Sequence, residues 1–262
     1  MTRTDIFSVA GLRVVVTAGG QGIGRAVAER FLEAGAQVAV CDVNAGLLQD
    51  LQATLPRLHT TAADVADPAQ VEAFFGGVYD LFGGIDVLVN NAGIGGGRAA
   101  LEDIAYADWD RAISVNLNGM FYCIKQVAPR MKHDRSGCIV NIATASVRTG
   151  LPLRTPYVAS KAGVMGLTHN VARELGAFNI RCNSILPGLI DNARGRALVQ
   201  RAADDSGRDF ATVEAEVLRY ISLRCWIDPT EIGDAAIFLA SRAGRHITGQ
   251  SLGVCGNVEW EI

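Results

Sequence analysis

The segment Thr17-Ala18-Gly19-Gly20-Gln21-Gly22-Ile23-Gly24 decides the expected fold of this chain. It follows a β-branched run at residues 12–17 and precedes a stretch of helical spacing at residues 22–34. Glycine permits the sharp turn from strand to helix, and a helix N-terminus attracts phosphate groups. The segment therefore predicts a pyrophosphate-binding turn that is formed by Gly19, Gln21, Gly22, Ile23 and Gly24.

Beyond this turn, apolar runs of strand length alternate with helix-length segments. The runs lack polar alternation, which is typical of strands covered on both faces. This order predicts an α/β fold in a single domain over residues 1–262: a Rossmann-type doubly wound parallel sheet of about seven strands with helices on both faces. We expect strands at residues 12–17, 36–41, 58–63, 85–89, 138–143, 180–186 and 251–254, and helices at residues 22–34, 45–54, 68–82, 109–131, 156–177 and 229–241.

Residues 189–224 interrupt this alternation. The segment is polar, lies between an expected strand and the last expected helix, and carries two short helical stretches at residues 193–203 and 210–223. A long excursion in a compact domain is usually functional, so a helical lid over the substrate is expected. A surface decoration is the alternative.

The ends of the second, third and fourth expected strands supply further candidate cofactor contacts. Asp42 lies 18 residues after Gly24, where a carboxylate accepts hydrogen bonds from ribose hydroxyls and repels a 2′-phosphate. Gln21 and Val43 supply no cation for such a phosphate, so NAD is the expected cofactor, and a solvated strand-end aspartate is the alternative. The contacts expected at these strand ends are Asp42, Val43, Asp64, Val65, Asn91, Ala92 and Gly93.

A candidate proton-transfer pair lies in the segment Tyr157-Val158-Ala159-Ser160-Lys161. Spacing of four places Tyr157 and Lys161 on one face of the expected helix. A nearby ammonium favours the phenolate and lowers the tyrosine pKa toward the working range of a general acid/base. A surface pair of no catalytic importance is the alternative for these two residues taken alone.

Together these pieces resemble the short-chain dehydrogenase/reductase family, in its branch of single-domain enzymes, over nearly the whole chain. The matching positions are residues 17–24, Asp64, residues 90–93, Asn116, Tyr157, Lys161, Pro187 and Gly188. The resemblance implies NAD(P)-dependent oxidation of a secondary alcohol or reduction of a ketone, by a homotetramer. It also implies that Tyr157 exchanges the proton and that Lys161 holds the nicotinamide ribose. Asn116 would hold a water of the proton relay, and the nicotinamide contacts would come from Pro187, Gly188 and Ile190.

Four positions depart from the family pattern. Ala18 stands where the first glycine usually lies, and its small side chain is expected to leave binding intact. The serine that polarises the carbonyl is replaced by Thr144, thirteen residues before Tyr157, with Ser146 as a nearby substitute. Asn192 replaces the usual threonine after Pro187-Gly188, and we count Ser146 and Asn192 as substrate contacts. Cys255 and Asn257 stand where aspartate and glycine are common.

Composition excludes several other classes of protein. The 24 basic and 27 acidic residues give a net charge of −3 without any basic block, so a nucleic-acid partner is not expected. The six cysteines and four histidines are scattered, which predicts no metal site and a reducing compartment. The first residues lack a signal-peptide pattern and no apolar stretch reaches the roughly 20 residues that span a bilayer. A cytoplasmic protein without a membrane partner is therefore expected.

An NAD-linked alcohol dehydrogenase or ketoreductase is the leading functional hypothesis. A non-catalytic NAD-binding sensor on the same fold is the alternative, since fold alone does not fix function. A sugar-nucleotide epimerase is disfavoured because its longer C-terminal substrate domain is absent. Because guanidinium groups bind carboxylates and phosphates, a polar or anionic substrate is a further hypothesis. It depends on five arginines near the expected site: Arg98, Arg148, Arg154, Arg194 and Arg196.

Overall fold

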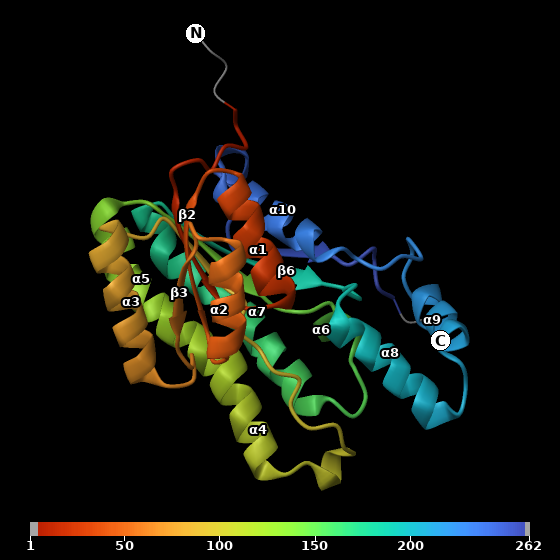
Figure 1. The fold of residues 1–262 in the computed structure, drawn as a ribbon. Coiled ribbons are helices and arrows are strands. Elements are labelled where there is room, and N and C mark those ends of the chain that lie inside the picture. The colour runs from red at the N-terminus through yellow and green to blue at the C-terminus, as the bar shows by residue number, and fades with distance from the viewer. Residues whose placement is uncertain (1–4, 260–262) are drawn as a thin grey trace.

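The structure is a computed structural model that describes residues 5–259. Within these residues, seven parallel strands form one sheet in the order β3-β2-β1-β4-β5-β6-β7, which confirms the predicted doubly wound fold (Figure 1). The strand order reverses between β1 and β4, and the carboxyl ends of strands leave a binding crevice at such a point. The strands are β1 (Arg13–Thr17), β2 (Gln37–Asp42), β3 (His59–Ala62), β4 (Val87–Asn90), β5 (Gly137–Ile142), β6 (Ile180–Pro187) and β7 (Ser251–Val254).

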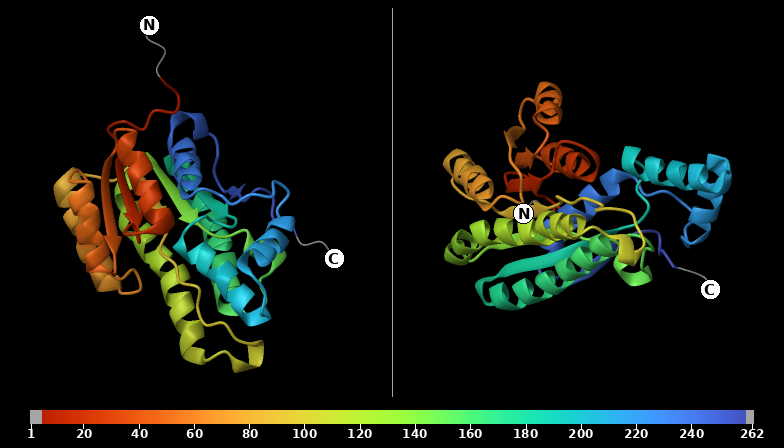
Figure 2. Two further views of the ribbon diagram at one scale, coloured as in Figure 1. Left: turned by 45° about the vertical axis from the view of Figure 1, so that its right-hand side comes forward. Right: turned by 90° about the horizontal axis from the view of Figure 1, so that it is seen from below.

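Helices cover both faces of the sheet (Figure 2). One face is covered by α1 (Gly22–Glu33), α2 (Ala45–Thr54) and α10 (Pro229–Ala240). The other face is covered by α3 (Pro68–Phe82), α5 (Gly119–Asp134) and α7 (Thr155–Leu175). None of the helices in the described part of the chain combines the length and hydrophobicity that a membrane crossing requires.

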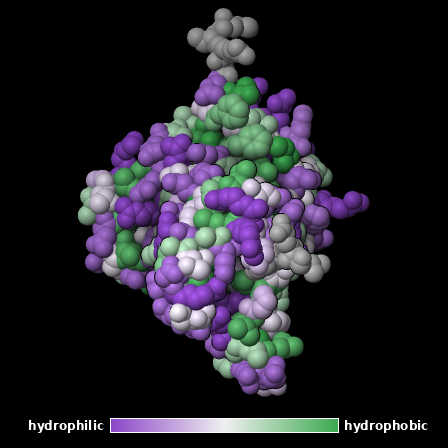
Figure 3. All heavy atoms as spheres, turned by 90° about the vertical axis from the view of Figure 1, so that its right-hand side faces the viewer, coloured by the Kyte–Doolittle hydropathy of each residue, from purple (hydrophilic) through white to green (hydrophobic). Residues whose placement is uncertain are grey.

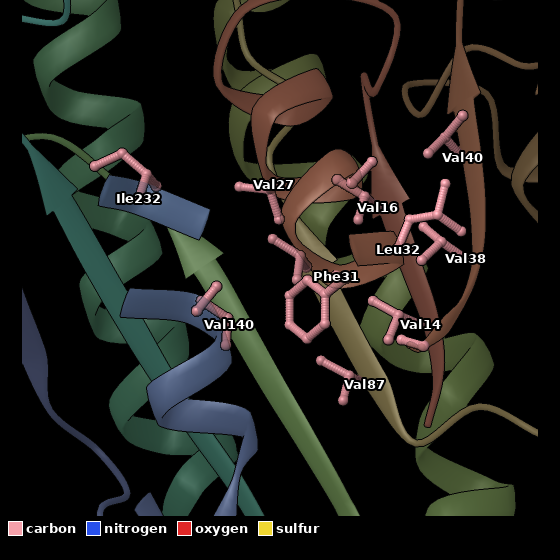
Figure 4. Close-up of a cluster of buried hydrophobic side chains, with 14 of the residues drawn as sticks. Val14, Val16, Val27, Phe31, Leu32, Val38, Val40, Val87, Val140 and Ile232 are labelled. Carbon is pink, nitrogen blue, oxygen red and sulfur yellow. The ribbon is translucent and has the colours of Figure 1, made fainter. Parts of the chain in front are cut away.

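The side chains of β1 show how the sheet separates two cores. Val14 and Val16 point toward α1 and α10, where they join a buried cluster that contains Phe31 and Ile232 (Figure 4). Val15, between them, points to the opposite face and joins the cluster of α3 and α5. Burial of each large apolar side chain contributes about 1.5–3 kcal/mol. Both faces are therefore dry, which explains why the strand sequences show no polar alternation.

The helix expected at residues 109–131 differs from the prediction. It begins earlier as α4 (Tyr106–Ile113), passes through a π-helical turn at Ser114–Asn118 and continues as α5. The backbone stays helical on both sides of the turn, so the three pieces form one long helix. A short helix, α6 (Ser146–Thr149), was not expected at all, and it begins two residues after Thr144.

The polar segment at residues 189–224 forms two helices, α8 (Ala193–Ser206) and α9 (Phe210–Arg219), beside the carboxyl ends of β5 and β6 (Figures 1 and 2). Asn192 caps α8 and Asp209 caps α9 through hydrogen bonds to backbone N–H groups. The pair holds a small apolar cluster of its own around Val199 and Val213. Figure 3 looks onto this side of the molecule, where hydrophilic side chains gather across the middle of the face.

Candidate active site

The glycine-rich turn brings α1 close to the backbone that precedes it. A Cβ atom on Gly24 would lie 2.1 Å from the carbonyl oxygen of Ala18, so only glycine fits at this position. The Asn91 amide donates to the carbonyl oxygens of Thr17 and Ala18, both at 3.1 Å. Gln21 is the N-cap residue of α1, and its side chain makes no capping hydrogen bond. The first N–H groups of α1 therefore have no side-chain cap and are available to an anion.

Ala18 has a left-handed backbone, with φ of 51°. A non-glycine residue in this region is strained because its Cβ crowds the backbone. We expected alanine to be tolerated here because its side chain is small. The structure shows that alanine at this position also strains the backbone of the turn.

Asp42 lies at the carboxyl end of β2, next to this turn, and is only 8% exposed. Its carboxylate accepts hydrogen bonds from the backbone N–H of Gly20 at 3.1 Å and of Asn44 at 3.0 Å. No described lysine or arginine pairs with it, and the neighbouring Val43 is 66% exposed. The local field beside the turn is therefore negative on the side where an adenosine ribose would lie.

Asp64 and Val65, at the end of β3, connect this edge of the sheet to the long helix. Asp64 forms an ion pair with Arg111 of α4 at 2.9 Å. Val65 is buried against Gly119, where a Cβ atom would lie 2.8 Å from the Val65 side chain. Both residues therefore hold the long helix against this edge of the sheet, in addition to any contact with a cofactor.

Asn116, Lys161 and Gly93 converge from three separate elements. A Cβ atom on Gly93 would lie 3.1 Å from Lys161 Nζ and 3.4 Å from Asn116 Oδ1. The Asn116 amide accepts a hydrogen bond from Ile94 N–H at 2.8 Å and donates one to the Ile94 carbonyl at 3.0 Å. These bonds tie the π-helical turn to the loop after β4. Such turns are frequent at functional sites because they redirect a side chain out of the regular helical spacing.

Ser160 is a functional candidate that the sequence interpretation missed. Its hydroxyl accepts a hydrogen bond from Asn116 Nδ2 at 2.9 Å and donates one to the Tyr157 carbonyl at 2.8 Å. It thereby fixes the first turn of α7 relative to the π-helical turn. The signal was present, since Ser160 lies between Tyr157 and Lys161, but the partner across the site could not be known.

Lys161 is buried, and its Nζ donates to the carbonyl of Ile142 at the end of β5, at 2.7 Å. Burial disfavours the ammonium, and the positive charge of Arg194 disfavours it further, so the pKa of Lys161 falls to about 7. The amine can therefore gain or lose a proton near neutral pH, which suits a proton-transfer site.

Thr144 lies in the loop after β5, and Ser146 is the first residue of α6. Thr144 is buried, and its hydroxyl lies 3.3 Å from the Ser146 hydroxyl, to which it donates. The next backbone N–H, of Ala145, donates to the carbonyl of Pro187 at 3.0 Å, so this loop adjoins the end of β6. Both hydroxyls therefore lie at the carboxyl edge of the sheet with the other site residues.

The chain leaves β6 along a closely packed path. A Cβ atom on Gly188 would lie 2.7 Å from Cys255 Cα, so glycine is required there. Ile190 is buried and forms a parallel bridge with Ile227. Asn192 caps α8 by accepting from Gly195 N–H at 2.8 Å, and its Nδ2 lies 3.6 Å from the position of a Cβ on Gly22. The start of the lid segment thus adjoins the glycine-rich turn.

The structure brings only part of the arginine set to the site. Arg154 donates to the carbonyl oxygens of Gly95 and Gly96, and the Arg194 guanidinium lies 5.9 Å from the centre of the Tyr157 ring. Arg148 instead donates to the Ser251 carbonyl on β7 and is exposed. The remaining two are held by acids: Arg98 by Asp205, and Arg196 by Asp191 and Glu214.

Comparison with known proteins shows where this arrangement belongs. A short-chain dehydrogenase model, described as enoyl-(acyl carrier protein) reductase, matches residues 17–257. The chain belongs to the short-chain dehydrogenase/reductase family. It is therefore an oxidoreductase, and Thr17, Asn90 and Pro187 are the last residues of strands that end at the same edge of its parallel sheet.

Individual relatives of this short-chain dehydrogenase/reductase cover nearly all of it. It is 35% identical over 249 residues to the 3-oxoacyl-[acyl-carrier-protein] reductase FabG of Staphylococcus epidermidis, covering 93% of this chain and 97% of that protein. An actinorhodin polyketide ketoreductase solved with NADPH superposes with a TM-score of 0.89 and 28% identity, over 94% of this chain and 96% of the other. An NAD⁺-bound xylitol dehydrogenase gives a TM-score of 0.89 and 29% identity, over 94% and 98%.

Proposed function

We propose that the protein transfers a hydride between NAD and a small secondary alcohol or ketone, with Tyr157 as the general acid/base. The convergence of Asn116, Lys161 and Gly93 beside the first turn of α7, which carries Tyr157, supports this proposal most directly. A non-catalytic sensor would need the glycine-rich turn but would have no use for this arrangement.

The residues of the crevice fit a dinucleotide. The glycine cradle at Gly24 leaves no room for a side chain, the N-terminus of α1 is uncapped, and Asp42 lies beside both. The remaining cofactor contacts that we propose lie along the same strand ends: Gly19, Gln21, Gly22, Ile23, Val43, Asp64, Val65, Asn91, Ala92, Gly93, Pro187, Gly188 and Ile190. When bound, the nicotinamide supplies the hydride chemistry, and the protein supplies orientation and proton transfer.

Asp42 supports NAD over NADP. One of the structural relatives contains NADPH and another NAD⁺, so the choice depends on the residues of this chain. A 2′-phosphate beside the Asp42 carboxylate would place like charges together without a described cation to offset them. The ribose hydroxyls of NAD can instead donate hydrogen bonds to that carboxylate.

The proton path that we propose begins at the substrate oxygen. The Tyr157 hydroxyl gives its proton to that oxygen in ketone reduction and takes it back in alcohol oxidation. Lys161, when charged, stabilises the phenolate, and its low pKa lets it pass a proton onward near neutral pH. Asn116 keeps the loop after β4 in place, and Thr144 or Ser146 donates a hydrogen bond to the substrate oxygen.

Assembly and lid movement extend the proposal. The exposed aromatic side chains of Trp109 on α4 and Phe121 on α5 fit helix packing between copies in a homotetramer. The helices α8 and α9 fit a lid, because they lie beside the crevice and pack mainly on each other.

The decisive experiment measures reduced-nicotinamide absorbance with a panel of ketones and secondary alcohols. We expect Tyr157→Phe to lower turnover about 10²–10⁴-fold while NADH binding, followed by fluorescence, changes little. Tyr106→Phe is the matched control, because Tyr106 is 91% exposed on α4. If Tyr157→Phe keeps more than about a tenth of the wild-type turnover with chemistry rate-limiting, Tyr157 is not the acid/base. NADH binding without turnover on any substrate would favour the sensor.

A further inference from the structure

The cations around the site fall into two groups. Arg98 and Arg196 are paired with acids at 2.6–2.8 Å, and the Arg196 guanidinium also stacks on Trp226, 4.3 Å from the ring centre. Arg154 and Arg194 form no ion pair with any residue between 5 and 259. The charges of the first group are neutralised within the described chain. Those of the second group are not, although Arg154 also donates hydrogen bonds to the carbonyls of Gly95 and Gly96.

Arg154 and Arg194 face each other across Gly95. A Cβ atom on Gly95 would lie 3.0 Å from Arg154 Nη1 and 3.3 Å from Arg194 Nη2, so both nitrogens surround a single point. The two residues come from different elements, since Arg154 is the N-cap residue of α7 and Arg194 lies in the first turn of α8. Like charges at this separation repel each other unless an anion lies between them.

The surroundings add positive charge. Burial lowers the pKa of Arg154, and the charges of Arg194, Arg201 and Arg98 lower it further. Arg194 also lies in the first turn of α8, where no acidic side chain offsets the positive end of the helix dipole. The hydrogen bonds of Arg154 to the Gly95 and Gly96 carbonyls account for its position but leave the gathered positive charge unbalanced, and a bound anion would balance it.

The anion would lie beside the proposed proton donor. The Arg194 guanidinium is 5.9 Å from the centre of the Tyr157 ring, and Arg154 precedes Tyr157 by three residues on the same helix. Planar guanidinium groups match a carboxylate in bidentate geometry. A short molecule can therefore place its carboxylate between the two arginines and its carbonyl carbon next to Tyr157.

We propose that Arg154 and Arg194 form a carboxylate-binding subsite, and that the substrate is a short keto acid or the corresponding hydroxy acid. This inference rests on the proposed function, since it names the substrate class of the same site. Because Arg154 belongs to the body of the protein and Arg194 to the lid segment, the carboxylate would also hold α8 against α7. Both arginines are therefore specificity-determining residues for the reaction.

The test uses three pairs of probes: pyruvate, acetoacetate and levulinate, each with its methyl ester. The chain length varies within the series, and the charge alone varies within a pair. We expect wild-type protein with NADH to reduce at least one acid with a higher kcat/KM than its ester. Arg154→Met and Arg194→Met should each lower the ratio of kcat/KM for that acid over kcat/KM for its ester about 10–100-fold, mainly through the KM of the acid. Any effect of the lost Arg194 charge on Lys161 acts on both probes and cancels in this ratio. Arg148→Met is the matched control, because its guanidinium contacts the Ser251 carbonyl.

A second readout needs no turnover. Calorimetric titration of each acid into the protein saturated with NAD⁺ should show binding that weakens about 10–100-fold in both site variants and not in Arg148→Met. Reduction of the esters without any arginine-dependent preference for an acid overturns the carboxylate subsite and leaves the proposed function intact. Arginine-dependent binding of an acid without reduction of any probe supports the subsite and contradicts the proposed function. If no probe binds and none is reduced, both the carboxylate subsite and the proposed function are contradicted.

Discussion

The two sides of the crevice are built differently. On the glycine-rich side, each polar group is held by backbone nearby: Asp42 accepts from Gly20 and Asn44, and Asn91 donates to Thr17. On the lid side, Arg154 and Arg194 come from separate helices and lack acidic partners among residues 5–259. The glycine-rich side is therefore preorganised: its backbone hydrogen bonds fix its shape without a ligand. On the second side, the proposed carboxylate would neutralise the two guanidinium groups.

Adding one methyl group to the glycine-rich side should have the largest effect on stability and on NADH binding. In Gly24→Ala the new Cβ would meet the Ala18 carbonyl at 2.1 Å, and backbone cannot move aside as a side chain can. We expect a loss of about 3–5 kcal/mol of stability in urea unfolding, with NADH binding abolished. Gly77→Ala is the control, because nothing lies within 4 Å of that position in α3, and it should stabilise by about 0.5–1 kcal/mol. Equal stability and NADH binding in the two variants would contradict a preorganised glycine-rich side.

The next largest effect concerns the buried Lys161 and the pH dependence of the free energy of unfolding. Its pKa falls from 10.5 to about 7 on folding, so the unfolded chain binds more protons between these pH values. The contribution of Lys161 to the free energy of unfolding should therefore rise as pH increases from about 7 to 10.5, and below pH 7 this contribution should be constant. Buried thiols, whose pKa values are raised by burial, oppose this trend at the upper end of the range. Lys161→Met should remove the Lys161 contribution and stabilise the protein at pH 6.5 by on the order of 3 kcal/mol.

Urea unfolding at pH 6.5 and pH 9 measures this slope without relying on activity. Lys125→Met provides the control, because Lys125 is exposed on α5 and the substitution changes the charge equally. A wild-type protein whose slope matches that of Lys161→Met would show that the buried amine keeps its ordinary pKa.

A smaller effect is expected for the cofactor preference. Asp42→Ala removes the carboxylate that we propose binds the ribose hydroxyls, so the ratio of kcat/KM for NADH over NADPH should fall about tenfold, with weaker NADH binding. Asp50→Ala, on the exposed side of α2, makes the same charge change away from the turn and should leave the ratio unaltered. A wild-type preference for NADPH would overturn the role of Asp42.

The smallest effect comes from releasing strain on the glycine-rich side. Ala18 has φ of 51°, and Ala18→Gly should raise the free energy of unfolding by about 1 kcal/mol. In contrast, Ala53→Gly, exposed within α2, should lower it by a similar amount because the glycine is helical there. Chemical denaturation of the pair tests whether the turn is strained, since two substitutions of the same kind should have opposite signs.

The same contrast explains what could be predicted from the sequence. The seven strands and most helices follow from local patterns, and the glycine-rich turn is a continuous segment between the first strand and the first helix. Asp42 could be placed because a parallel sheet brings all strand ends to one edge. These inferences need periodicity and topology, which the amino-acid order contains directly.

Other features depend on contacts between distant residues. The π-helical turn exists where Asn116 bonds to Ile94 and Ser160, 22 and 44 residues away. A periodicity argument over residues 109–131 cannot foresee such bonds and predicts a regular helix. The arginines show the same limit, because Arg148 and Arg154 are equally plausible in the sequence, yet only Arg154 faces Arg194.

The π-helical turn at Ser114–Asn118 also sets the phase of one long helix. Each residue of an α-helix advances about 100° around the axis, so an extra residue rotates everything after it by roughly a quarter turn. Upstream, α4 contacts α7 beside the site; downstream, α5 presents Met120, Cys123 and Val127 to the interior. Deleting one residue here would leave the helix intact but turn those three side chains away from the sheet. A single-residue change in length at this point thus rotates α5 relative to α4. If α4 kept its contact with α7, α5 would no longer direct its apolar side chains to the interior, and the reverse also holds.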